Sequence, residues 1–271
     1  MMNNGRGRPA LGRTAVLTLA FVLAAGRLLL AAVGCDLNDP DRDVKRLFPD
    51  STGYKTIYVS IAKRGGAELL RRIEDRLGDR FQGLFETADV PYTMYEIYRG
   101  DALVGYIHGV NQKGSFGGLQ VFLALDLEGT IRSFYFQKLT AKDAKAFRDP
   151  AFGRQFEGLS LKDFYGYDVR TGPETAAGPA GRIRNPAPES EADFRAVLRA
   201  VKKNLILVDE FLLANRHLSH FNPGHQSPSR DSTDVNPWRN SEFPATGTGA
   251  PTSAEDRSRR RKSMELQGES R

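Results

Sequence analysis

The chain has 271 residues, 40% of them hydrophobic and 27% charged, which is enough for one good core or two small ones. Its formal net charge of +6 includes Arg6, Arg8, Arg13 and Arg27, which precede Cys35 with no acidic residue among them. Subtracting those four positive charges leaves +2 for the chain from Cys35 onward. So small a charge forms no broad basic face, and we expect no nucleic-acid partner.

The N-terminus has the pattern of a secretory leader. Arginines among Gly, Asn and Pro residues precede an apolar stretch over residues 15–34, whose last residues, Ala32-Val33-Gly34, are small. Together with Cys35 they resemble the lipobox of bacterial lipoproteins, where a peptidase cuts before the cysteine and the cysteine is acylated. Cys35 is the only cysteine, and lipidation explains a lone thiol in an exported protein. We predict a lipoprotein signal peptide over residues 1–34 and lipidation of Cys35.

Two alternatives to this anchor are an uncleaved membrane span and a buried free cysteine. The apolar stretch is nearly long enough to cross a bilayer. Arg27 interrupts it, however, at a cost of roughly 2.5–3.5 kcal/mol at a membrane centre. Asp36 resembles the signal that retains lipoproteins of enteric bacteria at the inner membrane. We expect an exported protein held by membrane lipid on the periplasmic side, with the inner membrane favoured over the outer.

Residues 35–48 are predicted to be a tether and residues 49–217 a folded domain. The segment 54–61 alternates β-branched and aromatic residues with polar ones, which predicts a strand. Over residues 67–81 apolar residues recur three or four positions apart, which predicts an amphipathic helix. Strands are also predicted over residues 92–98, 102–109, 119–125 and 130–138. Their short turns indicate an antiparallel meander, with a glycine-rich loop over residues 113–118.

Two pairs of residues in the C-terminal half have the spacing of helix caps. Thr140 with Asp143 predicts a short helix that ends near Pro150. Ser190 with Asp193 predicts a long helix that reaches residue 212 and closes the core against the sheet. Residues 218–271 lack periodicity, which predicts a disordered tail. The predicted fold class is α+β, an antiparallel β-meander with packed helices.

The order of these elements resembles the FMN-binding domain family, which includes flavoprotein subunits of the Rnf complex and of the sodium-pumping NADH:quinone reductase. Residues 91–106 match its aromatic strand, charged turn and following strand, and residues 117–131 its glycine-rich loop and next strands. Residues 150–158 are similar to its Phe-x-x-Gln-Phe-x-Gly stretch. The resemblance covers roughly residues 44–215. It implies an FMN cofactor, electron transfer at a membrane surface, and subunits of a membrane redox complex as partners.

Glycines in the loop allow backbone amides to approach a phosphate, while hydroxyl, ammonium and aromatic side chains can add donors and ring contacts. The predicted cofactor-binding residues are Gly114, Ser115, Phe116, Gly117, Gly118, Lys138, Thr140 and Phe156. The alternative is that the loop is only a hairpin connection.

The chain departs from the respiratory members of the family where they attach FMN phosphate to a threonine. The stretch aligned with their Ser-Gly-Ala-Thr motif has no threonine at the attachment position: it reads Pro188-Glu189-Ser190-Glu191-Ala192-Asp193. A second register places Glu174 at that position. We therefore expect noncovalent FMN. The alternative is a non-enzymatic lipoprotein that keeps the fold as a binding or scaffold module.

The sequence gives little support for a metal site or for acid–base catalysis. His217, His220 and His225 cluster near the end of the long helix, but no acid or cysteine completes a metal site. His108 on an apolar strand is interpreted as a structural residue with satisfied hydrogen bonds. Asp209 and Glu210 are adjacent on a helix, so we expect no paired acid–base site there. We predict no catalytic residue and no metal.

Overall fold

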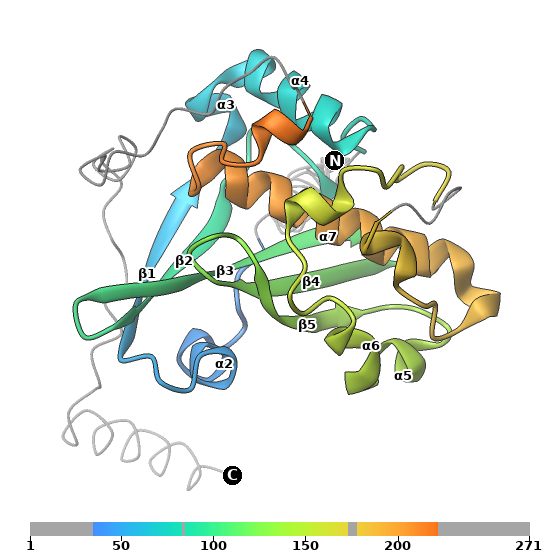
Figure 1. Cartoon of the computed structure of the whole chain (residues 1–271), viewed down its shortest axis with the longest axis horizontal. Coiled ribbons are helices and arrows are strands. Elements are labelled where there is room, and N and C mark those ends of the chain that lie inside the picture. The colour runs from blue at the N-terminus through green and yellow to red at the C-terminus, as the bar shows by residue number, and fades with distance from the viewer. Residues whose placement is uncertain (1–34, 83–84, 173–177, 222–271) are drawn as a thin grey trace, which may run out of the picture.

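The computed structural model describes residues 35–82, 85–172 and 178–221 (Figure 1). The predicted signal peptide, Glu174, His225 and most of the predicted tail lie outside the described residues. No helix within the described part is long and apolar enough to cross a membrane.

Five strands form one antiparallel sheet in the order β1-β2-β3-β4-β5, which confirms the predicted α+β meander. The strands are β1 Gly53–Val59, β2 Tyr92–Arg99, β3 Ala102–Lys113, β4 Gly118–Leu125 and β5 Ile131–Leu139. Strand β3 is longer than predicted because its pairing with β4 continues to Lys113 opposite Gly118. Only residues 114–117 therefore remain as a hairpin loop.

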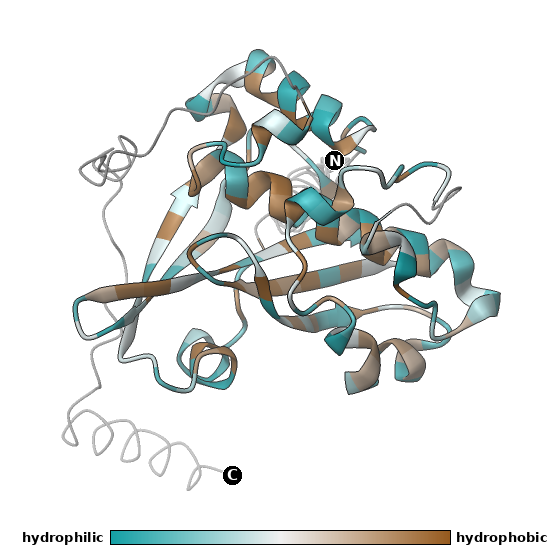
Figure 2. Ribbon diagram, viewed as in Figure 1, coloured by the Kyte–Doolittle hydropathy of each residue, from teal (hydrophilic) through white to brown (hydrophobic). Residues whose placement is uncertain are grey.

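The predicted long helix, α7 (Glu191–Phe211), lies across one face of the sheet (Figure 1). It packs on β3 and β4, and α4 (Gly66–Leu77) packs against it as well. The consecutive residues 205–208 are all buried, so the helix has no solvent-exposed side over this stretch. Figure 2 shows that apolar and polar residues are interspersed along α7.

The remaining helices are short and differ in detail from the prediction. They are α3 Ile61–Arg64, α5 Ala144–Phe147 and α6 Pro150–Arg154, with 3-10 turns at Leu161–Phe164, Ala180–Arg182, Pro188–Ser190 and Leu218–His220. Pro150 begins α6 instead of ending a helix, because proline is tolerated in a first turn and Asp149 accepts a hydrogen bond from the Ala151 amide at 2.7 Å. Helix α4 ends at Leu77 because Gly78 takes a left-handed conformation, with φ of 79°.

Residues 35–48 are not the free tether that the sequence predicted, but cover the other face of the sheet. They form a short strap that ends in α2 (Pro40–Leu47). Val44 and Phe48 are buried against Ile97 and Ile107 of the sheet. Gly105 makes this packing fit, because a Cβ at that position would lie 2.8 Å from the Phe48 ring. The sheet therefore has a hydrophobic core on each face.

Hydrogen bonds to two side chains of the sheet hold the strap before α2 begins. The Leu37 amide donates to the Tyr95 hydroxyl at 3.0 Å. The Asn38 amide donates to Gln137 Oε1 at 2.9 Å, and Gln137 Nε2 donates to the Asp36 carbonyl at 2.8 Å. These tertiary bonds, together with the buried apolar side chains, explain why so polar a segment is ordered.

Candidate functional site

The predicted phosphate-binding loop is closed by a carboxylate from α7. The Ser115 amide donates to Asp193 Oδ1 at 2.7 Å, and the Gly114 amide donates to the Gly117 carbonyl at 2.7 Å. Asp193 is only 1% exposed. A Cβ at Gly114 would lie 2.8 Å from the same carboxylate oxygen, so this contact requires glycine. A phosphate that used the Ser115 amide would have to displace a buried acid.

The structure places most of the predicted cofactor residues at one end of the sheet. Thr140 lies against the loop: its amide donates to the Gly118 carbonyl at 3.3 Å, and its Cγ2 would be 2.9 Å from a Cβ on Gly117. Lys138 is exposed on β5, paired in register with Gln120 of β4. Phe116 projects from the loop with 67% of its surface exposed. These residues therefore lie at the same end of the sheet.

Phe156, the remaining predicted cofactor residue, lies elsewhere. Its ring is fully buried and stacks on Phe134, with centroids 4.6 Å apart and planes 11° apart. The chain just after it joins the opposite end of β5, where the Gly158 amide donates to the Ile131 carbonyl. Phe156 therefore belongs to the core and does not reach the glycine-rich loop.

The two predicted helix-capping pairs form tertiary contacts in place of local caps. The Ser190 hydroxyl donates to the carboxylate of Asp143, and neither Ser190 nor Asp143 caps its own helix through its side chain. Asp193 is engaged by Ser115, as described above. Two carboxylates thus lie near the start of α7, and their charges disfavour a phosphate there.

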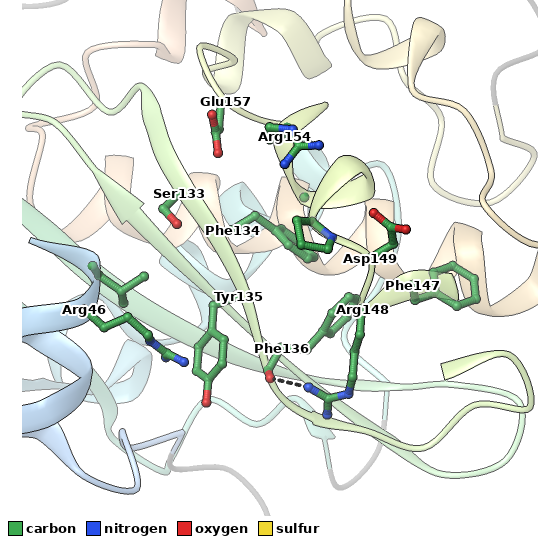
Figure 3. A pocket seen from close by; sticks show the side chains of 13 residues that line it. Arg46, Ser133, Phe134, Tyr135, Phe136, Phe147, Arg148, Asp149, Arg154 and Glu157 are labelled. Atoms are coloured by element: carbon green, nitrogen blue, oxygen red, sulfur yellow. Dashed lines mark hydrogen bonds between the residues drawn. The ribbon is translucent and has the colours of Figure 1, made fainter. Parts of the chain in front are cut away.

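A cavity of about 590 Å³ lies along the edge strand β5, between α2 and α6 (Figure 3). Arg46 of α2 lies over the Tyr135 ring, with its guanidinium carbon 3.7 Å from the ring centroid. Arg148 donates to the Phe136 carbonyl at 3.0 Å. The Arg154 side chain has no hydrogen-bond or ion-pair partner among the residues that the structure describes. The volume is within the usual range for small-molecule sites.

The charged residues that line this cavity are three arginines, Arg46, Arg148 and Arg154, and two acids, Asp149 and Glu157. Asp43 pairs with Arg46 at 3.3 Å, and one oxygen of Asp149 accepts the Ala151 amide of α6. The other acid in the wall is Glu157, which is exposed. Guanidinium groups bind phosphate and carboxylate in planar geometry and also stack on aromatic rings. The side chains here thus suit a planar ligand that carries an anionic group, and the donor set fits FMN.

A buried ionic network, which the sequence reasoning missed, joins α7 to the chain after α4. Glu86 accepts hydrogen bonds from Arg199 and Lys203 of α7, and all three side chains are buried. Burial alone would raise the pKa of Glu86, but the charges of Lys203 and Arg199 outweigh it, so the pKa lies below its usual range. Burial lowers the pKa of Lys203 to about 8, against the opposing effect of Glu86.

A second network joins α7 to α4. Asp209 and Glu210 both accept from Arg76, and Glu210 also accepts from Arg72 at 2.7 Å. The two adjacent acids therefore converge on one arginine, which is a structural ion pair and not an acid–base pair. A signal for both networks was present in the sequence, since four consecutive apolar residues at 205–208 indicate a helix buried on several sides.

His108 is structural, as interpreted from the sequence, but only one of its ring nitrogens is satisfied. Its Nδ1 lies 2.9 Å from Asn204 Oδ1, while Asn204 Nδ2 donates to the His108 carbonyl at 2.9 Å. Because the Asn204 oxygen faces the ring, Nδ1 carries the proton of the neutral imidazole. Nε2 is buried and has no hydrogen-bond partner among the described residues, and burial lowers the pKa of His108 to about 4.

Cys35, the predicted lipidation site and the first residue of the strap, has a free thiol that is 2% exposed and packs in the core between the strap and the sheet. Burial raises the pKa of this thiol. Its position in the described chain corresponds to the alternative of a buried free cysteine. An acylated sulfur would have to leave this close-packed cluster, because acyl chains cannot fit in it.

His217 and His220 stack on each other with ring centroids 5.9 Å apart. Within the described ranges, no group of three or more His, Cys, Asp or Glu side chains is placed to hold a metal ion. In comparisons with known proteins, no family model matches the chain, and no curated protein matches it.

Proposed function

We propose that this chain is an exported, membrane-tethered protein that binds FMN without a covalent bond, in the cavity between α2, β5 and α6. The observation that carries the proposal is the cluster of Arg46, Arg148 and Arg154 around the aromatic edge strand. Phe134 and Tyr135 line the cavity from opposite faces of β5, so either ring could offer an apolar contact to a flavin, and Arg148 and Arg154 offer donors to its phosphate. When bound, the flavin supplies the electron-transfer chemistry, with subunits of a membrane redox complex as its partners.

The cavity supports this proposal better than the glycine-rich loop does. The Ser115 amide, which a phosphate in the loop would need, is already bonded to Asp193. The guanidinium of Arg154 is unengaged among the described residues, and that of Arg148 holds one carbonyl and keeps further N–H groups free. The fold class agrees with the resemblance, but a fold hosts many functions, so the side chains of the cavity carry the argument.

Titration of residues 35–221 with FMN tests the proposal, with flavin fluorescence as the readout. We expect saturable binding that weakens at least tenfold in the double variant Arg148→Ala/Arg154→Ala. Arg71→Ala, an exposed arginine on α4, is the matched control and should leave the affinity unchanged. If the protein shows no saturable binding, or if the double variant binds as tightly as the parent, flavin binding in this cavity is refuted.

A second candidate function, a non-enzymatic binding or scaffold module, is favoured by the Asp193 contact that closes the loop. In that case the domain keeps the architecture and holds no flavin. A folded domain that neither copurifies with flavin nor binds added FMN would support it, and flavin binding in either place would exclude it.

The tether itself is tested in a bacterium that processes lipoproteins. Cys35→Ser should leave the leader uncut and abolish incorporation of labelled fatty acid. Normal cleavage of the variant would show that Cys35 is not the lipidation site.

A further inference from the structure

The hairpin loop between β3 and β4 exposes the aromatic side chain of Phe116 to solvent, and hydrogen bonds fix the backbone of this loop. Phe116 is 67% exposed and Tyr165 is 52% exposed, and these are the exposed large hydrophobic side chains of the described residues. The Gly114–Gly117 hydrogen bond and the Ser115–Asp193 bond hold the loop on both sides of the hairpin tip. Because these bonds fix the loop backbone, the Phe116 side chain stays directed away from the fold.

Cationic side chains share this end of the sheet. Lys113 at the end of β3 and Lys138 and Lys142 near the end of β5 are all exposed. Thr140, between the last two, contacts the loop at Gly117. Two acids at this end are engaged, since Asp193 accepts the Ser115 amide and Asp143 accepts the Ser190 hydroxyl, whereas Asp36 is exposed. An exposed aromatic ring flanked by lysines is the side-chain pattern of a membrane interface.

The proposed lipid anchor lies at the same end. Gln137, which precedes Lys138, binds the strap at Asp36 and Asn38. Gln137 also donates to Gln120 at 3.4 Å, and Gln120 lies two residues from the start of β4 at Gly118. Because residues 36–38 are fixed there, acyl chains on Cys35 would leave the fold close to the hairpin tip.

We propose that this end of the sheet is a membrane-contact surface, in which Phe116 enters the bilayer interface while Lys113, Lys138 and Lys142 meet anionic lipid headgroups. The proposed lipid tether is needed only to orient the domain on the membrane, and the proposal does not depend on flavin binding. It gives the glycine-rich loop a role in presenting Phe116 to lipid.

Residues 35–221 are suited to a direct test, because they contain both hydrophobic cores and no tryptophan. Phe116→Trp and Tyr165→Trp each introduce a single reporter at an exposed position, and the second is the matched control. With vesicles of equal parts phosphatidylglycerol and phosphatidylcholine, we expect the Phe116→Trp emission to shift to shorter wavelength and to be quenched by brominated lipid. The Tyr165→Trp emission should not change.

Cosedimentation with the same vesicles supplies the second measurement. Phe116→Ser should weaken binding at least tenfold, and Lys138→Gln/Lys142→Gln should remove the preference for phosphatidylglycerol over pure phosphatidylcholine. Both sites are exposed, so the fold should persist, which circular dichroism checks. Unchanged Phe116→Trp emission, or equal responses of the two reporters, would overturn the proposal. Neither result bears on the FMN titration, so the two proposals can fail separately.

Discussion

Replacing Glu86 with alanine should destabilise the domain more than any surface substitution. Glu86 is 4% exposed and accepts from Arg199 and Lys203, which are 5% and 1% exposed. The alanine variant leaves Lys203 buried without a carboxylate, while Arg199 keeps only its ion pair with Asp79, at 3.2 Å. Removing one partner from a buried ion pair typically costs about 3–5 kcal/mol. That is a large part of the roughly 5–15 kcal/mol by which domains are stable.

Urea unfolding of residues 35–221, followed by far-UV circular dichroism, measures this loss. With a denaturant slope of about 2 kcal/mol per molar, the expected loss corresponds to a midpoint about 1.5–2.5 M lower. Glu189→Ala is the matched control, because Glu189 is exposed, and it should change the stability by less than about 0.5 kcal/mol.

If unpaired buried charge causes the loss of stability, removing one of the cations should reverse part of it. In the Glu86→Ala background, Lys203→Met should recover part of the lost stability, because it removes one of the stranded charges. If Glu86→Ala unfolds at the same midpoint as Glu189→Ala, the network does not stabilise the domain. If the double variant Glu86→Ala/Lys203→Met is less stable than Glu86→Ala, the loss of stability does not come from unpaired charge.

Two further predictions concern His108 and Gly105. Burial lowers the pKa of His108 to about 4, from about 6.5 in an unfolded chain. The contribution of the neutral His108 to the free energy of unfolding is therefore full above about pH 6.5 and is lost as the pH falls towards 4. Urea unfolding at pH 7 and at pH 4 measures this effect. Between the two pH values the parent protein should lose up to about 3 kcal/mol more unfolding free energy than His108→Gln does, and equal losses would contradict the lowered pKa. Gly105→Ala would place its Cβ 2.3 Å from the Leu125 carbonyl and 2.8 Å from the Phe48 ring, so the strap should loosen and Cys35 should react faster with a thiol reagent. Gly53→Ala, which meets nothing within 4 Å, is the control, and equal thiol reactivity in the two variants would argue against this packing.

The sequence determined the meander and the long helix because both depend on local signals. Alternation along each strand and short turns between strands specify an antiparallel order. The apolar run before residue 212 likewise marks α7 without reference to any partner. The element boundaries were less accurate where tertiary pairing extended a strand, as at Lys113.

Only the tertiary structure decided which polar groups are free to bind a ligand. Asp193 was interpreted as a helix cap, yet it bonds to Ser115, 78 residues away in the chain. Residues 35–48 contain too few apolar side chains to indicate burial, and they are ordered by Gly105, Tyr95 and Gln137. The arginines of the cavity come from α2 and from the chain around α6, and no local spacing relates them. Periodicity reports the face on which a residue lies, whereas the partner of a donor or a charge depends on contacts between distant segments.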